Sequence, residues 1–193
     1  MTTPGRYAAD EGTFAKSAGS AAARGGVLIA VAVTFGLTLD GKEALVRHFL
    51  LGLFTVCFTC FIHVLVMFYL IGTGKDIRDA VEESPELGDR FIPLTRQLKR
   101  LVFPRATLAL FLSVFGVLMG GEIHSRVISA PLIDGQYPIR ALGGWWVHAA
   151  LTGLAILANA WAFFGECRAA RLNRRAIQEI NAALAEAPSS ETT

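Results

Sequence analysis

The sequence contains little charge. Charged residues make up 18% of its 193 residues, against about 25% in a typical soluble domain, whereas 53% of its residues are hydrophobic. No Asp, Glu, Lys or Arg occurs in three long stretches, which are Phe49–Ile71, Ala106–Gly121 and Ala141–Gly165. This distribution excludes an ordinary soluble enzyme, and the apolar content excludes an intrinsically disordered chain.

Recognisable catalytic motifs are also lacking. The sequence has no H-E-x-x-H zinc motif, no G-x-G-x-x-G loop and no Ser-His-Asp arrangement. The net charge of +2 is small and divided along the chain, which argues against a nucleic acid as a partner. Function therefore has to be inferred from individual residues within the apolar stretches.

Apolar runs predict three membrane-spanning helices at Phe49–Ile71, Leu101–Gly121 and Gly144–Gly165. A further run, Gly25–Leu39, would extend over about 22 Å as a helix, which is short of the hydrocarbon core of about 30 Å. It becomes long enough when the four preceding residues are added, so residues 21–39 are predicted as a fourth span, with an interfacial helix as the alternative. The predicted fold is all-α, an integral membrane four-helix bundle.

Positive charge is distributed unevenly between the segments that connect the spans. Of the 18 Lys and Arg residues, only Lys42, Arg47, Arg126 and Arg140 fall in the first and third connecting loops. The others lie in the N-terminal tail, the central loop and the C-terminal tail. The positive-inside rule then predicts an inner membrane of bacterial type, with both termini and the central loop in the cytoplasm.

The regions around the bundle, which covers residues 21–165, are also assigned from the sequence. Residues 1–20 and 188–193 are predicted to be flexible tails. Residues 73–100 are predicted as a cytoplasmic loop that leads through an amphipathic segment into the next span. Residues 166–187 carry an apolar stripe and are predicted as a cytoplasmic amphipathic helix, which lies on the membrane surface, caps the bundle or binds a partner. The stripe consists of Leu172, Ile177, Ile180 and Leu184.

The few polar residues inside the spans lie on one face of each helix. At 100° per residue, four polar residues of the last span fall within a narrow arc. The span before it has a stripe of small residues that ends in His124, and Gly116 and Gly120 in this stripe allow another backbone to approach closely. Because polar groups are costly in hydrocarbon, these faces are expected to point into the bundle. The arc contains His148, Thr152, Asn159 and Glu166.

Two of the four histidines are predicted to lie level with each other at the outer boundary of the membrane. His124 and His148 are each about 27 Å from the cytoplasmic ends of their helices, and both point inward. Such a pair suits the axial ligands of a haem b. Together with His48, which begins its span at the same level, the pair would suit a copper or zinc ion instead. A quinone site and simple hydrogen bonds to neighbouring polar groups are the remaining interpretations.

His63 lies much deeper, about 22 Å below His48, and Asn159 lies about 16 Å below His148. The similar depths predict a hydrogen bond between His63 and Asn159. An ionisable residue within a membrane is also a functional hypothesis in its own right. His63 and Asn159 are therefore candidate cofactor-binding residues, for haem or quinone, and His63 is a candidate member of a proton relay.

These residues lead to two expectations of function. The first is a small integral membrane subunit that binds haem b or another redox cofactor through inward-facing histidines, for electron transfer within a membrane complex such as one of a respiratory chain. The second is a non-catalytic structural or assembly subunit of a larger membrane complex. The expected partners are the lipid bilayer and other protein subunits.

Overall fold

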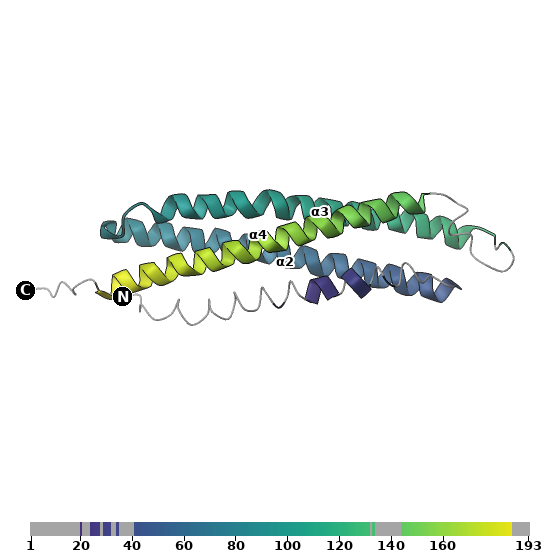
Figure 1. The fold of residues 1–193 in the computed structure, drawn as a ribbon, viewed down its shortest axis with the longest axis horizontal. Coiled ribbons are helices and arrows are strands. Elements are labelled where there is room, and N and C mark those ends of the chain that lie inside the picture. The colour runs from purple at the N-terminus through teal and green to yellow at the C-terminus, as the bar shows by residue number, and fades with distance from the viewer. Residues whose placement is uncertain are drawn as a thin grey trace, which may run out of the picture.

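The computed structural model describes residues 20, 24–27, 29–31, 34, 41–131, 133 and 144–186. The long helices lie side by side in a rod, with α2 and α4 running in one direction and α3 in the other (Figure 1). The described residues are almost entirely helical and contain no strand, which confirms the all-α prediction. The elements are α2 (Gly41–Glu83), the 3-10 helix η1 (Pro85–Leu87), α3 (Phe91–Ser129) and α4 (Trp145–Glu186).

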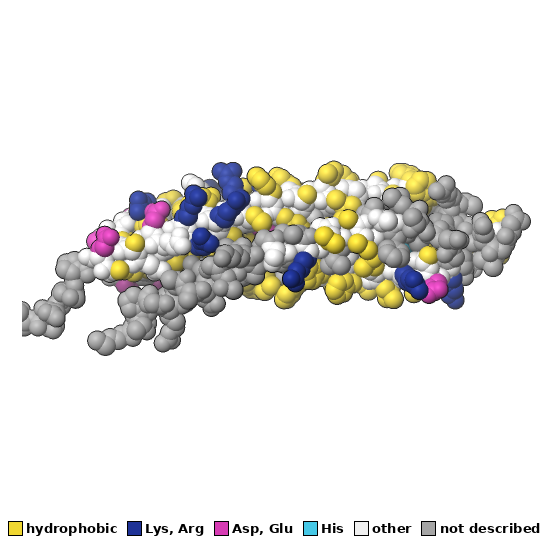
Figure 2. Space-filling model, turned by 60° about the horizontal axis from the view of Figure 1, so that its bottom comes forward, with side chains coloured by type: hydrophobic (Ala, Val, Ile, Leu, Met, Phe, Trp, Pro, Cys, Tyr) yellow, Lys and Arg dark blue, Asp and Glu magenta, His cyan; other side chains and the backbone are white. Residues whose placement is uncertain are grey.

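Each of the three long helices is long and apolar enough to cross a membrane, and each contains one of the three predicted spans. Their outer faces carry large apolar side chains, such as Phe61, Phe111 and Leu157, which are 60%, 63% and 68% exposed. Hydrophobic side chains predominate over the middle of the rod, whereas Lys, Arg, Asp and Glu are most numerous toward the end where α2 and α4 end, with a smaller group at the opposite end (Figure 2). This surface is suited to lipid around the middle of the rod, which indicates a membrane location.

The predicted fourth span, residues 21–39, falls largely outside the described residues. Within it, residues 24–27 and 29–31 are helical. A Cβ atom at Gly25 would lie 3.5 Å from the Thr59 side chain of α2 and 3.6 Å from the Phe163 ring of α4. This segment therefore packs against α2 and α4, and the structure describes a bundle of three helices with part of a fourth element beside it. The predicted tails lie outside the described residues, apart from Ser20.

The long helices extend well beyond the thickness of a membrane. They have 43, 39 and 42 residues, which correspond to about 60 Å at 1.5 Å per residue, against a hydrocarbon core of about 30 Å. The predicted loop 73–100 consists of the end of α2, η1 and the beginning of α3, and the predicted amphipathic helix 166–187 is the continuation of α4. We call the end of the rod that contains Glu83 and Glu186 the charged end, and the opposite end, where α4 begins, the histidine end.

The apolar stripe of residues 166–187 packs inside the rod, against the other helices. Ile177 and Ile180 are buried in a cluster with side chains of α2 and α3, and Leu184 packs against the same cluster. Burial of these side chains between three helices is more favourable than a surface position, because all sides of the stripe are removed from water. The buried cluster contains Ile77, Val81, Leu87, Phe91, Ala176, Ile177 and Ile180.

Buried positions along the helices follow one another at intervals of three and four residues, as in coiled coils. On α4, three buried polar residues, Asn159, Glu166 and Asn173, recur every seven residues. This spacing keeps all three on the side that faces the other helices. The buried positions of α3 are Phe91, Thr95, Leu98, Val102, Ala106, Ala109, Ser113, Gly116, Gly120, Ile123 and Val127.

The turn at the charged end explains why α2 and α3 are antiparallel neighbours. Pro85 has no backbone N–H, so it ends α2 and begins η1. The chain then reverses at Gly88, whose φ of +71° is strained for any residue with a side chain. Leu87, between them, is buried in the cluster at the charged end. The short connection thus fixes the register of α2 against α3.

Candidate functional site

Three histidines from three helices meet at the histidine end. The ring of His48 on α2 lies 5.2 Å from the ring of His124 on α3 and 6.3 Å from the ring of His148 on α4, measured between ring centroids. The rings of His124 and His148 lie 6.1 Å apart. The structure therefore brings together the three residues predicted as metal ligands, His48 included.

His148 is held in one orientation by the backbone of α3. Its Nδ1–H donates a hydrogen bond of 3.1 Å to the carbonyl oxygen of Gly116, which can only accept. This bond assigns the proton to Nδ1 and leaves the lone pair on Nε2 available for a ligand. A Cβ atom at Gly120 would lie only 2.6 Å from Cε1 of His148. The two glycines thus have distinct roles: Gly116 accepts the hydrogen bond, and Gly120 makes room for the ring.

His124 has a buried polar atom without a partner. Its Nδ1 is inaccessible to solvent and makes no hydrogen bond within the described part of the chain. The ring stands perpendicular to the ring of Phe49, with centroids 5.9 Å apart. A buried polar atom without a hydrogen bond is costly and rare in folded proteins, so this nitrogen marks the histidine cluster as a place for a further ligand.

The three imidazoles do not form a ready metal site. Among the residues that the structure describes, no group of three or more His, Cys, Asp or Glu side chains is arranged to hold a metal ion. Glu122, which lies close to His124 in sequence, points outward and forms a salt bridge of 2.8 Å with Arg126. A carboxylate is therefore not offered to the histidines from that position.

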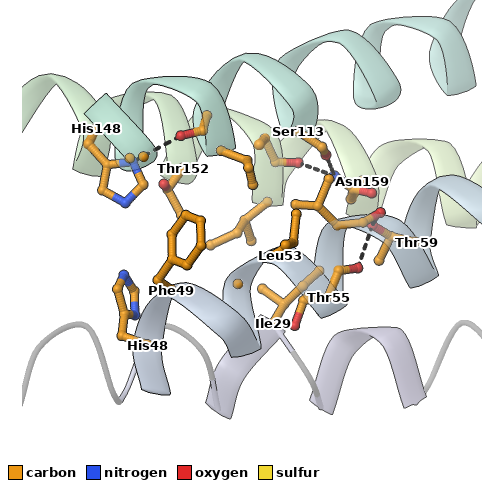
Figure 3. A pocket seen from close by; sticks show the side chains of 18 of the residues that line it. Ile29, His48, Phe49, Leu53, Thr55, Thr59, Ser113, His148, Thr152 and Asn159 are labelled. Atoms are coloured by element: carbon orange, nitrogen blue, oxygen red, sulfur yellow. Dashed lines mark hydrogen bonds between the residues drawn. The ribbon is translucent and has the colours of Figure 1, made fainter. Parts of the chain in front are cut away.

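An apolar cavity begins at the histidines and follows the bundle inward. His48 and His148 lie at one end of it, and Thr59, Ser113 and Asn159 lie at the other (Figure 3). Its volume is about 110 Å³, whereas a single water needs about 10–15 Å³ in the same measure. The wall between the two ends consists of apolar side chains and of Gly52, Gly116, Gly120 and Gly121. A ligand much larger than water therefore fits between the helices.

A chain of buried hydrogen bonds starts at the inner end of the cavity. Asn159 Nδ2 donates to Ser113 Oγ at 2.9 Å and to the Ala155 carbonyl at 2.7 Å. Asn159 Oδ1 lies 2.9 Å from Nε2 of His63, and Nδ1 of His63 lies 2.6 Å from Oε1 of Glu166. The hydrogen bond predicted between His63 and Asn159 is therefore present, and it forms part of a longer network.

The His63 ring is enclosed on its faces as well as at its edges. It stacks on Phe163, with centroids 4.7 Å apart and planes inclined by 23°. The side chains of His63 and Glu166 are only 1% and 4% exposed. The predicted cofactor-binding residues therefore do not form one site. His124 and His148 lie at the outer end of the cavity and Asn159 lies at its inner end. His63 lies behind Asn159, outside the cavity lining.

The sequence placed Glu166 on the inward arc of α4 but did not predict its partner. Its side chain reaches His63 inside the bundle, although Glu166 directly follows the last predicted span. Side chains of helical residues point toward the N-terminus of the helix, so Glu166 reaches back along α4 in the direction of Asn159. The sequence did contain a usable signal, because Glu166 lies seven residues after Asn159 and so shares its buried face.

Comparison with known proteins does not assign the chain to a family. No protein-family model matches it, and neither the curated proteins nor the solved structures yield a match. The proposals below therefore depend on the residues and their geometry alone.

Proposed function

We propose that the protein is a small membrane-embedded redox subunit that binds haem b, which His124 and His148 would hold. The observation that carries this proposal is the distance of 6.1 Å between their ring centroids. A single metal atom between two facing imidazole nitrogens requires a separation of this order, because each bond from a metal to a histidine nitrogen is about 2 Å long.

The residues around the pair fit such a group. The hydrogen bond from Nδ1 of His148 to Gly116 is of the kind that orients metal-bound histidines and raises their basicity. The buried Nδ1 of His124 has no hydrogen-bond partner among the described residues, which is unusual for a buried polar atom. A Cβ atom at Gly52 or Gly116 would meet no other atom within 4 Å, so the backbone of α2 and α3 is open to the cavity at these two positions.

Haem b supplies one-electron chemistry when it is bound. The protein would set the reduction potential through two neutral imidazole ligands and through exclusion of water by the apolar wall. Electrons would pass between a quinol in the bilayer and a protein partner in a membrane complex. With the charged end in the cytoplasm, as the distribution of Lys and Arg favours, the histidine cluster lies near the outer surface of an inner membrane.

A second candidate is a single copper or zinc ion bound by all three histidines. It is favoured by the ring of His48, which lies within 5.2 Å of His124, since imidazole suits both metals. It requires the rings to turn, because none of the described groups is already arranged around an ion. Haem needs only two of the three histidines, and we therefore place it first.

The test is a reduced-minus-oxidised absorption spectrum of the protein purified in detergent from cells supplied with haem precursor, together with metal analysis of the same sample. We expect b-type bands that are lost in His124→Ala and in His148→Ala but retained in His48→Ala. Glu122→Gln is the matched control, since Glu122 lies level with the histidines but points outward.

The other outcomes of this experiment are equally decisive. A colourless protein that contains one copper or zinc ion, lost in all three histidine variants, would replace the haem proposal by the three-histidine metal site. A colourless protein without stoichiometric metal would overturn both redox proposals and favour the structural or assembly subunit.

A further inference from the structure

We propose that His63 and Glu166 share one proton within the bundle and form a site that takes up and releases a proton, separate from the histidine cluster. This inference goes beyond the proposed redox function, because it follows from the hydrogen bonds of the protein chain alone and does not depend on haem.

The orientation of Asn159 fixes one of the two protons of His63. The atom of the Asn159 amide that lies 2.7 Å from the carbonyl oxygen of Ala155 must be the NH₂ group, because a carbonyl can only accept a hydrogen bond. The other amide atom, Oδ1, is then an acceptor, and it lies 2.9 Å from Nε2 of His63. Nε2 of His63 therefore carries a hydrogen and donates it to Asn159.

The other ring nitrogen shares its proton with a carboxyl group. Nδ1 of His63 and Oε1 of Glu166 are 2.6 Å apart, a distance at which two bare lone pairs would repel each other strongly. One proton must lie between them, either on the imidazole beside a carboxylate or on the carboxylic acid beside a neutral ring. Both arrangements leave the pair without net charge, so the short bond lets the proton shift between the two atoms with no net charge created in the bundle.

Few other charged or titratable groups surround the pair of His63 and Glu166. Within the described residues, no further carboxylate lies within 4.0 Å of the His63 ring nitrogens, and no further cation lies within 4.0 Å of the Glu166 carboxylate. The titratable or charged residues on the surrounding elements are the exposed Arg24 on the N-terminal segment, Cys60 on α2, Arg105 on α3 and Cys167 on α4. The Arg105 guanidinium lies over the ring of Trp161, 4.5 Å from its centroid, and beside Gly165, where a Cβ atom would be 2.9 Å from Nη1.

Burial argues that the pair has a function beyond packing. Ion pairs that are removed from water rarely stabilise a protein more than apolar side chains of the same size would, and ionisable residues inside a membrane typically carry function. The pair also has a useful position. On one side, Asn159 and Ser113 connect it to the cavity, and on the other side Asn173, bonded to Thr73 at 2.9 Å, continues the buried polar face toward the charged end.

Each hydrogen bond between the pair and the cavity runs in the same direction. His63 donates to Asn159, and Asn159 donates to Ser113. A change of charge on the pair therefore polarises these bonds and alters the electrostatic potential at the inner end of the cavity. A proton taken up by the pair would thus compensate a negative charge that enters the cavity. The proton itself would reach the pair without passing through Asn159, since an amide accepts and donates hydrogen bonds but does not readily take up a proton.

The test follows the ring nitrogens of His63 by nuclear magnetic resonance in protein that is labelled with ¹⁵N-histidine and reconstituted in lipid nanodiscs, over the range of pH in which the helices stay folded. We expect the two ¹⁵N resonances of His63 to shift in a single pH-dependent step. In Glu166→Gln, whose amide can donate to Nδ1 but cannot exchange a proton, the step should be lost and the neutral-ring signal should remain at all pH values.

Glu122→Gln removes an exposed carboxylate and should leave the His63 step unchanged. If Glu166→Gln does not fold, Glu166→Asp serves in its place and should move the step to another pH. Resonances of wild-type His63 that stay constant throughout would overturn the proposal, because the pair would then be a fixed structural bridge. None of these outcomes depends on bound haem, so failure of the redox proposal would leave this one intact, and the reverse also holds.

Discussion

Gly120 lies directly against the imidazole of His148. A Cβ atom at Gly120 would come within 2.6 Å of Cε1 and 3.0 Å of Nδ1 of that ring, a distance at which one of the two residues must move. Since the same ring donates a hydrogen bond to Gly116 one turn away on α3, the position of His148 is determined by the absence of a side chain on its neighbour.

Replacement of Gly120 by Ala should therefore displace His148 and break its bond to Gly116. We expect a loss of about 1–3 kcal/mol in the free energy of unfolding, as for other overpacked sites, together with loss of any ligand bound to His148. Gly116→Ala is a close control, because a Cβ atom there would meet nothing within 4 Å and the carbonyl acceptor is retained. Thermal unfolding in detergent would measure the difference, and equal effects of the two substitutions would contradict this account.

Asn159 should be important for stability because it bonds to both neighbouring helices. Leucine at this position would leave Nε2–H of His63 without an acceptor and Ser113 without its donor. Unsatisfied buried groups cost about 1–3 kcal/mol, so the melting temperature should fall clearly. Thr152→Val is the matched control: Thr152 lines the same cavity two turns away. An unchanged melting temperature for Asn159→Leu would show that the network is weaker than its geometry indicates.

The continuation of α4 beyond the membrane can be tested at Ile180, which is 4% exposed. Ile180→Ala should leave a cavity in the cluster at the charged end and cost about 2–5 kcal/mol. Gln178, two residues away, is exposed, and Gln178→Ala should have little effect. If residues 166–186 instead lay on the membrane surface, the two substitutions would be nearly equivalent in denaturant or thermal unfolding of the reconstituted protein.

The proposed orientation predicts which end of the rod is accessible from outside the cell. In a background without native cysteines, Lys42→Cys at the histidine end should react with a membrane-impermeant maleimide in intact cells. Arg175→Cys, on the exposed side of α4 near the charged end, should react only after the membrane is permeabilised. The reverse pattern would show that the protein has the opposite orientation in the membrane, with the histidine cluster on the cytoplasmic side.

The three membrane-crossing helices and the inward faces of α3 and α4 followed from the sequence alone. Absence of charge over long stretches leaves few alternatives to a membrane helix, and a rotation of 100° per residue places Asn159 on the same face as Glu166 without knowledge of any neighbour. The level of His124 with His148, and the bond between His63 and Asn159, could also be predicted, because depth along a helix is proportional to residue number.

Only the tertiary structure showed which side chains meet. That His48 points into the histidine cluster could not be told from its level along α2, because the rotation and tilt of a helix against its neighbours depend on packing along its whole length. Glu166 pairs with His63 for the same reason, and because its side chain reaches back toward the middle of the rod. The packing of the helices against one another at the charged end could not be predicted either, since an amphipathic stripe has the same sequence pattern whether it faces a membrane surface or two other helices.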